Sequence, residues 1–211
     1  WLNGTSFDYV NVYAIDDYSS QYMFYYTDSG YVKTDDWTDV DPNKFIKEIK
    51  ENYKASNEVR KNNGQPYVTN VTWKKKPYLD GIYNSVYYAL DVSWSDNTSS
   101  VEGTSIILGR EGYTTGKYIG GDNGYSEQML LNTSKMHKFN STKEYKDWKS
   151  GDKVAAAGIG ALLATTLGVK ALKPGIIAAG LLLLKKFWFI IFLPFIWLGN
   201  LFKGSGKKKK K

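Results

Sequence analysis

The stretch SVYYALDVSW, residues 85–94, has the most regular strand pattern in the chain and decides the fold class. Its large side chains alternate with small or polar ones, at Val86, Tyr88, Leu90, Val92 and Trp94. Because successive side chains of a strand point to opposite faces, this alternation predicts a strand with one buried face. A sheet that packs on a core through that face is therefore expected.

Further strand-like segments lie on both sides of this stretch. They are residues 7–13, 21–27, 67–74, 102–110 and 113–119. The last two are separated only by Gly-Arg-Glu-Gly at 109–112, a connection short enough for a hairpin. The second segment ends at the turn signal Asp-Ser-Gly at 28–30, so the first two are expected to form a hairpin or adjacent strands.

One long helix interrupts the strands. Asp41 predicts its cap, Pro42 its first residue, and Asn-Asn-Gly at 62–64 its end. The buried stripe of this helix is expected at Ile46, Ile49 and Tyr53. Short helical turns are expected at 126–131 and 142–148. Strands joined by short turns around one long helix predict an α+β domain with a largely antiparallel sheet in residues 1–150.

The positive charge of the chain is unevenly distributed. The formal net charge is +7, yet residues 1–150 carry 17 Lys plus Arg and 20 Asp plus Glu, a net of −3. Residues 151–211 carry 11 Lys and one acidic residue, a net of +10. The basic character belongs to the C-terminal part, which argues against nucleic acid as a partner.

The C-terminal part is largely apolar from residue 154 to residue 202. The run FWFIIFLPFIWL at 187–198 has no polar face, so residues 174–203 are expected to form a transmembrane helix. The predicted anchor residues are Phe187, Trp188, Phe195, Trp197 and Lys203. Residues 204–211 hold a spacer and five lysines, which suit a cytoplasmic tail next to anionic lipid.

The sequence allows one or two membrane crossings. Residues 151–173 are rich in Ala and Gly, and a Lys-Pro boundary at 170–174 separates them from the stronger apolar run. Two crossings would put the domain in the cytoplasm. With one crossing, the lysines at 185–186 snorkel to one membrane edge and residues 151–173 form an interfacial or membrane helix. We expect one crossing, with residues 1–150 outside and the lysine tail in the cytoplasm.

Catalytic chemistry has few candidate residues. Without cysteine, and with His137 as the only histidine, neither a thiolate site nor a two-histidine zinc site can form, and no cofactor is expected. Asp35 and Asp36 precede Trp37 and could bind a metal or act as acid and base. Adjacent carboxylates diverge along an extended chain, however. A loop in which one of them accepts backbone or arginine hydrogen bonds is the favoured interpretation.

Arginine is rare in this lysine-rich chain. There are 26 lysines and only two arginines, Arg60 and Arg110, so both positions are expected to need the planar five-donor guanidinium. Partly buried salt bridges that hold the helix to the sheet are the favoured interpretation, and binding of an anionic ligand is the alternative. The candidate ligand or structural cluster comprises Asp35, Asp36, Trp37, Glu58, Arg60, Trp73, Arg110 and Glu111.

Five short motifs occur in one order along the chain. They are GYVKTDDW at 30–37, ASNEVR at 55–60, Trp73 with PYLD at 77–80, LGREG at 108–112 and DKVAAAG at 152–158. This ordered set resembles the membrane-anchored proteins of domain-of-unknown-function family 2167. The resemblance implies a bacterial protein with a signal peptide, an extracytoplasmic domain and a C-terminal membrane segment, and it implies no activity. The chain starts at Trp1 without a leader, as expected of a mature form or a fragment.

Three functions fit such a chain. The first prediction is a binding or scaffolding module of the cell envelope, because a tyrosine-rich surface with Trp37, Trp73 and Trp94 suits contacts to envelope proteins or glycans. The second is a partner of membrane proteins that acts through its C-terminal helices. The third is a carboxylate-based envelope enzyme that uses Asp35, Asp36, Glu58 or Glu111. The lipid bilayer is the expected partner in each case, and no catalytic residue or metal ligand is assigned.

Overall fold

One antiparallel sheet forms the centre of the protein. A computed structural model describes residues 10–14 and 20–169 of the 211-residue chain. The described strands follow the order β1-β2-β6-β5-β4-β3, and each pair of neighbours is antiparallel. Their bounds are β1 Val10–Ala14, β2 Ser20–Thr27, β3 Val68–Asp80, β4 Ser85–Trp94, β5 Ser99–Leu108 and β6 Tyr113–Gly120. The predicted α+β class and antiparallel sheet are confirmed.

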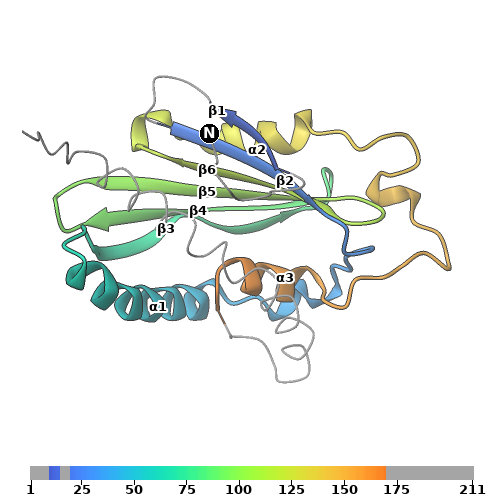
Figure 1. The fold of residues 1–211 in the computed structure, drawn as a ribbon. Helices are drawn as coiled ribbons and strands as arrows, with labels where there is room; N and C mark the ends of the chain where they lie inside the picture. Colours follow the sequence, from blue (N-terminus) through green and yellow to red (C-terminus); the bar gives the residue numbers. More distant parts are fainter. Residues whose placement is uncertain (1–9, 15–19, 170–211) are drawn as a thin grey trace, which may run out of the picture.

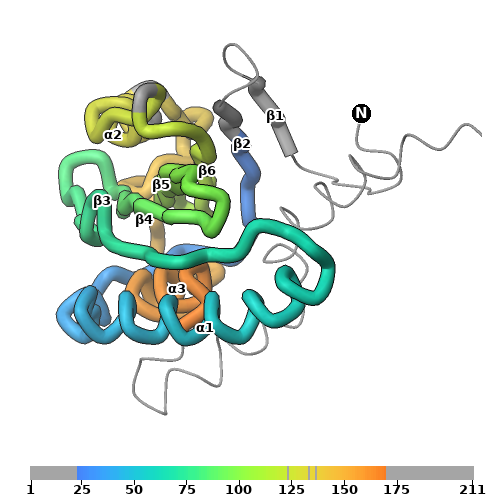
Figure 2. The backbone as a smooth tube through the Cα atoms, turned by 90° about the vertical axis from the view of Figure 1, so that its left-hand side faces the viewer, coloured from blue at the N-terminus to red at the C-terminus, as the bar shows by residue number. Residues whose placement is uncertain are grey.

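Helices cover both faces of this sheet. Figures 1 and 2 show α1 and α3 on one face and α2 on the other. The helices are α1 Pro42–Asn62, α2 Glu127–Met136 and α3 Ile159–Thr166, and the short 3-10 turns are η1 Asp35–Asp39, η2 Asp122–Gly124 and η3 Tyr145–Asp147. The expected helical turns at 126–131 and 142–148 correspond to α2 and η3.

The signals at both ends of α1 work as the sequence predicts. The Asp41 carboxylate accepts hydrogen bonds from the backbone N–H groups of Asn43 and Lys44 at 2.9 and 3.2 Å, and Pro42 is the first helical residue. The helix ends at Asn62, two residues before Gly64, whose φ of +64° suits glycine. Its buried stripe includes Phe45 and Ile49, with Ile46 and Tyr53 packed beside them.

Strand β4 is buried on both faces, where the sequence predicts one buried face. Its inward side chains on the α1 face include Val86 and Tyr88, as expected. The alternate residues Tyr87 and Ala89 pack under α2 against Leu130. The second face is buried because α2 covers the sheet there, which the alternation alone did not predict.

Strand β3 is longer than the sequence predicts. It continues past residue 74 to Asp80, through Lys75, Lys76 and Pro77. A proline removes a ladder donor, so this is tolerated because β3 is an edge strand, and the register shifts around Lys75 accommodate it. The longer β3 brings its hairpin with β4 to the same end of the sheet as the turn between β5 and β6.

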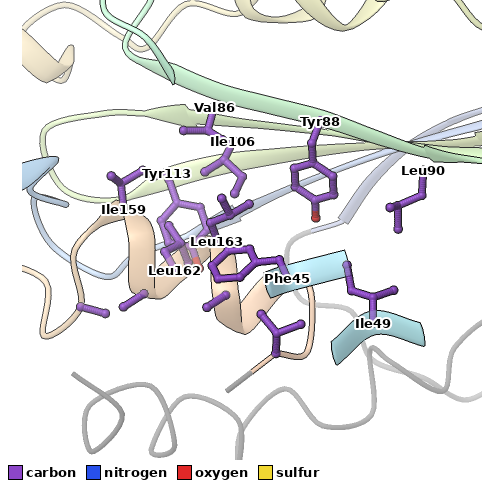
Figure 3. Packing of buried hydrophobic residues seen from close by; sticks show 14 of the residues in the cluster. Phe45, Ile49, Val86, Tyr88, Leu90, Ile106, Tyr113, Ile159, Leu162 and Leu163 are labelled. Carbon is purple, nitrogen blue, oxygen red and sulfur yellow. The ribbon is translucent and has the colours of Figure 1, made fainter. Parts of the chain in front are cut away.

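The larger core lies between the sheet and the helices α1 and α3. Figure 3 shows Phe45 of α1 and Leu162 and Leu163 of α3 facing Val86 and Ile106 of the sheet. Residues 154–169 were expected at or in a membrane, yet in the structure α3 packs in this core. The domain therefore extends past residue 150, at least to Val169.

The predicted transmembrane helix, residues 174–203, and the tail, residues 204–211, lie outside the described residues. So do the anchor residues Phe187, Trp188, Phe195, Trp197 and Lys203. Among the helices of residues 10–14 and 20–169, none has the length and apolar character needed to span a bilayer.

Candidate functional site

The Asp36 carboxylate binds the N-terminus of α3. Its oxygens accept hydrogen bonds from the backbone N–H groups of Gly160 at 2.9 Å and Ala161 at 3.0 Å. A side chain at Gly160 has no room, since a Cβ there would lie 2.7 Å from the Asp36 backbone oxygen. A carboxylate at a helix N-terminus satisfies free N–H groups and suits the helix dipole. The expected backbone hydrogen bonds are therefore confirmed for Asp36.

The other acidic candidates lie on separate elements. Asp35 is exposed on η1, and Glu58 is exposed on α1, 3.5 Å from the ammonium group of Lys61. Glu111, in the turn between β5 and β6, forms an ion pair with Lys143. In the part of the chain that the structure describes, no group of three or more His, Asp or Glu residues is arranged to hold a metal ion.

The predicted surface tryptophans are packed against the core. Trp37, Trp73 and Trp94 are all partly buried beside the larger core. The Trp73 indole N–H donates to the carbonyl of Pro42 at 3.0 Å, and the Trp94 indole N–H donates to the hydroxyl of Ser100 at 3.0 Å. These rings stabilise the α1 side of the sheet and are not part of an exposed binding surface.

Arg110 forms the salt bridge that the sequence predicts for it. Its Nε and Nη2 atoms donate to the two carboxylate oxygens of Asp152, each at 2.7 Å, and Nη1 donates to the carbonyl of Thr142. The hydrogen bond from Arg110 lowers the pKa of Asp152 to about 2. The sequence predicts a bridge that holds the long helix to the sheet, whereas this pair joins the turn after β5 to the segment before α3.

Arg60 is only 4% exposed and closes the C-terminal turn of α1. Its Nη1 atom donates to the carbonyl of Pro66 at 3.0 Å, and its guanidinium lies 4.7 Å from the centroid of the Trp94 ring. Burial lowers the pKa of Arg60, while Tyr53 and Glu102 counteract that effect. The planar group is used here for packing on a ring and for a carbonyl contact.

A set of polar residues lies between α1 and the sheet, and the sequence pattern did not lead to its prediction. At its centre is the Glu102 carboxylate of β5, whose charged form is favoured by the Tyr53 hydroxyl of α1. Burial raises the pKa of Glu102, although Lys117, Tyr53 and Arg60 all favour its charged form. Burial, together with Glu102, also raises the pKa of Tyr53. The alternation of β5 could have predicted that Glu102 points inward, because it lies on the same face of the strand as Thr104, Ile106 and Leu108.

Residues 137–158, which we call the strap, wrap around one end of the sheet between α2 and α3 (Figure 1). Near its start, Phe139 packs edge-on against Tyr26 of β2. Near its end, the backbone of Tyr31 accepts a hydrogen bond from Ala155 and donates one to Lys153, at 2.9 and 2.8 Å. The strap therefore joins β2, the turn between β5 and β6, and α3.

Three aromatic rings are in contact where the strap passes the end of β2. Tyr31 stacks on Tyr145 with ring centroids 4.4 Å apart, and it meets Trp148 at a tilt with centroids 5.2 Å apart. The Tyr145 hydroxyl donates to the carbonyl of Val32 at 2.8 Å, which fixes that ring. Trp148 is 39% exposed, so part of a large apolar ring faces solvent on a rigid support.

His137, the only histidine of the chain, is partly buried. Its ring meets the Phe139 ring edge-on, with centroids 4.7 Å apart. Burial lowers the pKa of His137, which favours the neutral imidazole. The ring of His137 therefore packs on Phe139 within the strap, and Phe139 in turn contacts Tyr26 of β2.

Exposed apolar side chains gather at the end of the sheet that the strap covers. The large hydrophobic residues exposed in the described part of the chain are Tyr26, Val59, Tyr78, Ile82, Tyr83, Trp148 and Val154. Tyr78 lies near the end of β3, Ile82 and Tyr83 lie in the β3–β4 turn, Tyr26 pairs with Thr114 beside the β5–β6 turn, and Trp148 and Val154 lie in the strap. We call these six residues the aromatic end. Such a concentration is typical of an interaction surface.

The most exposed member of the aromatic end is Ile82, at 84%. It lies in the turn between β3 and β4, where the Asp80 carboxylate accepts hydrogen bonds from the N–H groups of Ile82 and Tyr83 at 2.9 and 3.1 Å. The Asn84 carbonyl accepts one from the Leu108 N–H at 2.9 Å, which ties the turn to β5. The sequence shows an apolar residue directly after Asp80-Gly81, a pattern that could have predicted an exposed apolar turn.

One family of proteins matches most of the chain. The family model described as "Protein of unknown function (DUF2167)" matches residues 10–196. No curated protein and no solved structure matches the chain.

Proposed function

We propose that this chain, which belongs to the DUF2167 family of proteins of unknown function, is a membrane-anchored binding module of the bacterial cell envelope. In this proposal the aromatic end is the contact surface. The exposed side chains of the aromatic end are the observation that supports the proposal. Exposing apolar groups to water costs free energy, and a concentration of them is typical of a surface that is covered by a partner.

The rigidity of the aromatic end supports binding. The ring contacts of Tyr31 with Tyr145 and Trp148 and the hydrogen-bonded turn at Ile82 hold their side chains in place before any partner arrives. A surface that is already ordered loses little conformational entropy on association. Tyrosine and tryptophan are also enriched at protein interfaces, where they combine an apolar ring with a polar atom.

The proposed location follows from the sequence of the C-terminal part. Residues 174–203 would cross the cytoplasmic membrane, with the domain outside and residues 204–211 in the cytoplasm. Protease added to intact spheroplasts should then digest the domain. Complete protection in sealed cells, with digestion after lysis, would support two crossings and a cytoplasmic domain.

Site-specific photo-crosslinking tests the contact surface. A photoreactive amino acid would replace Tyr83 or Trp148 in the full chain expressed in its host. Val59 is the matched control, because it is an exposed hydrophobic residue on α1, away from the aromatic end. Adducts at positions 83 and 148 but not at 59 are expected. Equal yields at all three positions, or no adducts at any, would contradict the proposal.

A second function, chemistry at Glu102, has one observation in its favour. A partly buried carboxylate with a raised pKa beside Tyr53 and Lys117 resembles the arrangement of a general acid. The envelope enzyme would then use Glu102, because Asp36 binds α3 and Glu111 pairs with Lys143. A hydrolase and transferase screen of the full chain tests this function, with Glu102→Gln as the inactive variant and Glu51→Gln, an exposed carboxylate on α1, as the control.

A further inference from the structure

We propose that the turn between β3 and β4, residues 80–85, inserts its Ile82 side chain into the surface of an anionic lipid bilayer. This inference rests on the proposed function, since it names the partner of the aromatic end. It concerns the folded domain and is separate from the predicted transmembrane helix.

The shape of the turn favours insertion. Ile82 has 84% of its surface exposed, and the two hydrogen bonds to Asp80 fix the backbone of the turn. Asp80 itself is buried, so its carboxylate does not oppose an anionic surface directly. Burying an exposed aliphatic side chain in an apolar medium is favourable, and the rigid turn needs no rearrangement to do so.

The residues around Ile82 have the composition of a membrane interface. Tyr83 and Tyr78 flank it and are 37% and 49% exposed. The ammonium group of Lys135 lies 5.7 Å from the Tyr83 ring, and that of Lys75, which is paired with Glu127 at 2.9 Å, lies 5.9 Å from the Tyr78 ring. Tyrosine rings suit the headgroup level of a bilayer, and lysine chains reach from apolar surface toward lipid phosphates.

The charge distribution selects an anionic partner. The strap holds five lysines and three acidic residues, a net of +2. Asp152 is paired with Arg110, while Lys143, Lys146 and Lys153 are paired with Glu111, Glu144 and Asp28, so the net charge of the strap decides its attraction to an anionic surface. Residues 1–136 hold 13 Lys plus Arg and 18 Asp plus Glu, a net of −5. A negative surface would therefore attract the strap and repel most of the remaining domain, which orients the aromatic end toward the lipid.

The absence of cysteine allows a direct test in the full chain. Gly81→Cys places a single thiol beside Ile82, where a new Cβ meets no atom within 4 Å. Gly121→Cys is the matched control, since it has the same open space and follows β6 at the opposite end of the sheet. Each thiol carries an environment-sensitive dye, and the labelled chains are reconstituted into vesicles of anionic phospholipid that contain a lipid-bound quencher.

The expected result is quenching at position 81 that exceeds quenching at position 121 by about twofold or more. Adding Ile82→Ser to the Gly81→Cys chain should remove the difference, and zwitterionic vesicles or high salt should reduce it. Equal quenching at positions 81 and 121, or quenching that Ile82→Ser leaves unchanged, would overturn the inference. If photo-crosslinking at Tyr83 succeeds while lipid quenching fails, the aromatic end has another partner and the proposed function stands.

Discussion

The segment that contains α3 should be required for the domain to fold, and a pair of truncated chains tests this. One chain ends after Val169, the last residue of the core, and the other ends after residue 150 and lacks α3. The sequence alone predicts that the domain ends at residue 150, so the shorter chain should fold. The structure places α3 in the core, so the shorter chain should not fold.

The magnitude follows from the burial of α3. Ile159 and Leu163 have no exposed surface and Leu162 is 4% exposed. At about 1.5–3 kcal/mol for each fully buried aliphatic side chain, the three contribute roughly 4.5–9 kcal/mol, an upper estimate because unfolded chains already bury some apolar surface. The total stability of a domain is about 5–15 kcal/mol. Loss of α3 therefore removes a large share of the free energy of unfolding.

Urea and thermal unfolding, followed by circular dichroism, measure the effect. The chain that ends at Val169 should unfold in one cooperative transition, while the chain that ends at residue 150 should lose that transition and bind a hydrophobic dye. In the longer chain, Leu163→Ala should lower the free energy of unfolding by about 2–5 kcal/mol. Equal midpoints for the two truncated chains would refute the role of α3 in the core.

Three further predictions concern charged groups. Asp36→Ala removes the cap of α3 and should cost about 0.5–2 kcal/mol in urea unfolding, and an unchanged midpoint would contradict this role. Burial raises the pKa of Glu102 above its usual 4.5, so folding favours its protonated form and stability falls as pH rises from 4.5 through the raised pKa. The melting temperature of Glu102→Gln should therefore exceed that of the unmutated chain by more at pH 7 than at pH 4. An equal difference at both pH values would contradict a raised pKa for Glu102. The pKa of Asp152 is lowered to about 2, so its stabilisation is present above 3.8 and lost as pH falls toward 2. Arg110→Lys removes the bidentate contact and should raise the Asp152 pKa toward 3.8 in a carboxylate NMR titration, whereas an unchanged pKa would show that the geometry does not matter.

Local signals explain why α1 and the central strands could be predicted from the sequence. The Asp41 cap, Pro42 and the Asn-Asn-Gly end act within a few residues, so the helix bounds follow from the chain itself. The alternation from Val86 to Val92 likewise places side chains on one face before any partner is known. These features depend on interactions between residues that are close together in the sequence, so they can be predicted without knowing the fold.

The polar contacts of the candidate sites needed the tertiary structure. Asp36 and Gly160 are 124 residues apart, and Arg110 and Asp152 are 42 residues apart. The sequence correctly favoured hydrogen-bonded roles for Asp36 and Arg110 because their chemistry requires partners when they are buried. The partners themselves depend on which strands and loops meet, and no local pattern encodes that.

Residues 154–169 show most clearly what the sequence determined and what only tertiary packing decided. Their apolar composition determines that they leave water, because exposing them costs free energy. A bilayer and a protein core are both apolar, so composition gives the same signal for either environment. The choice for α3 was made by the face of the sheet around Val86 and Ile106, by Phe45 of α1, and by the Asp36 carboxylate at the start of the helix. Those groups become neighbours only when the chain folds.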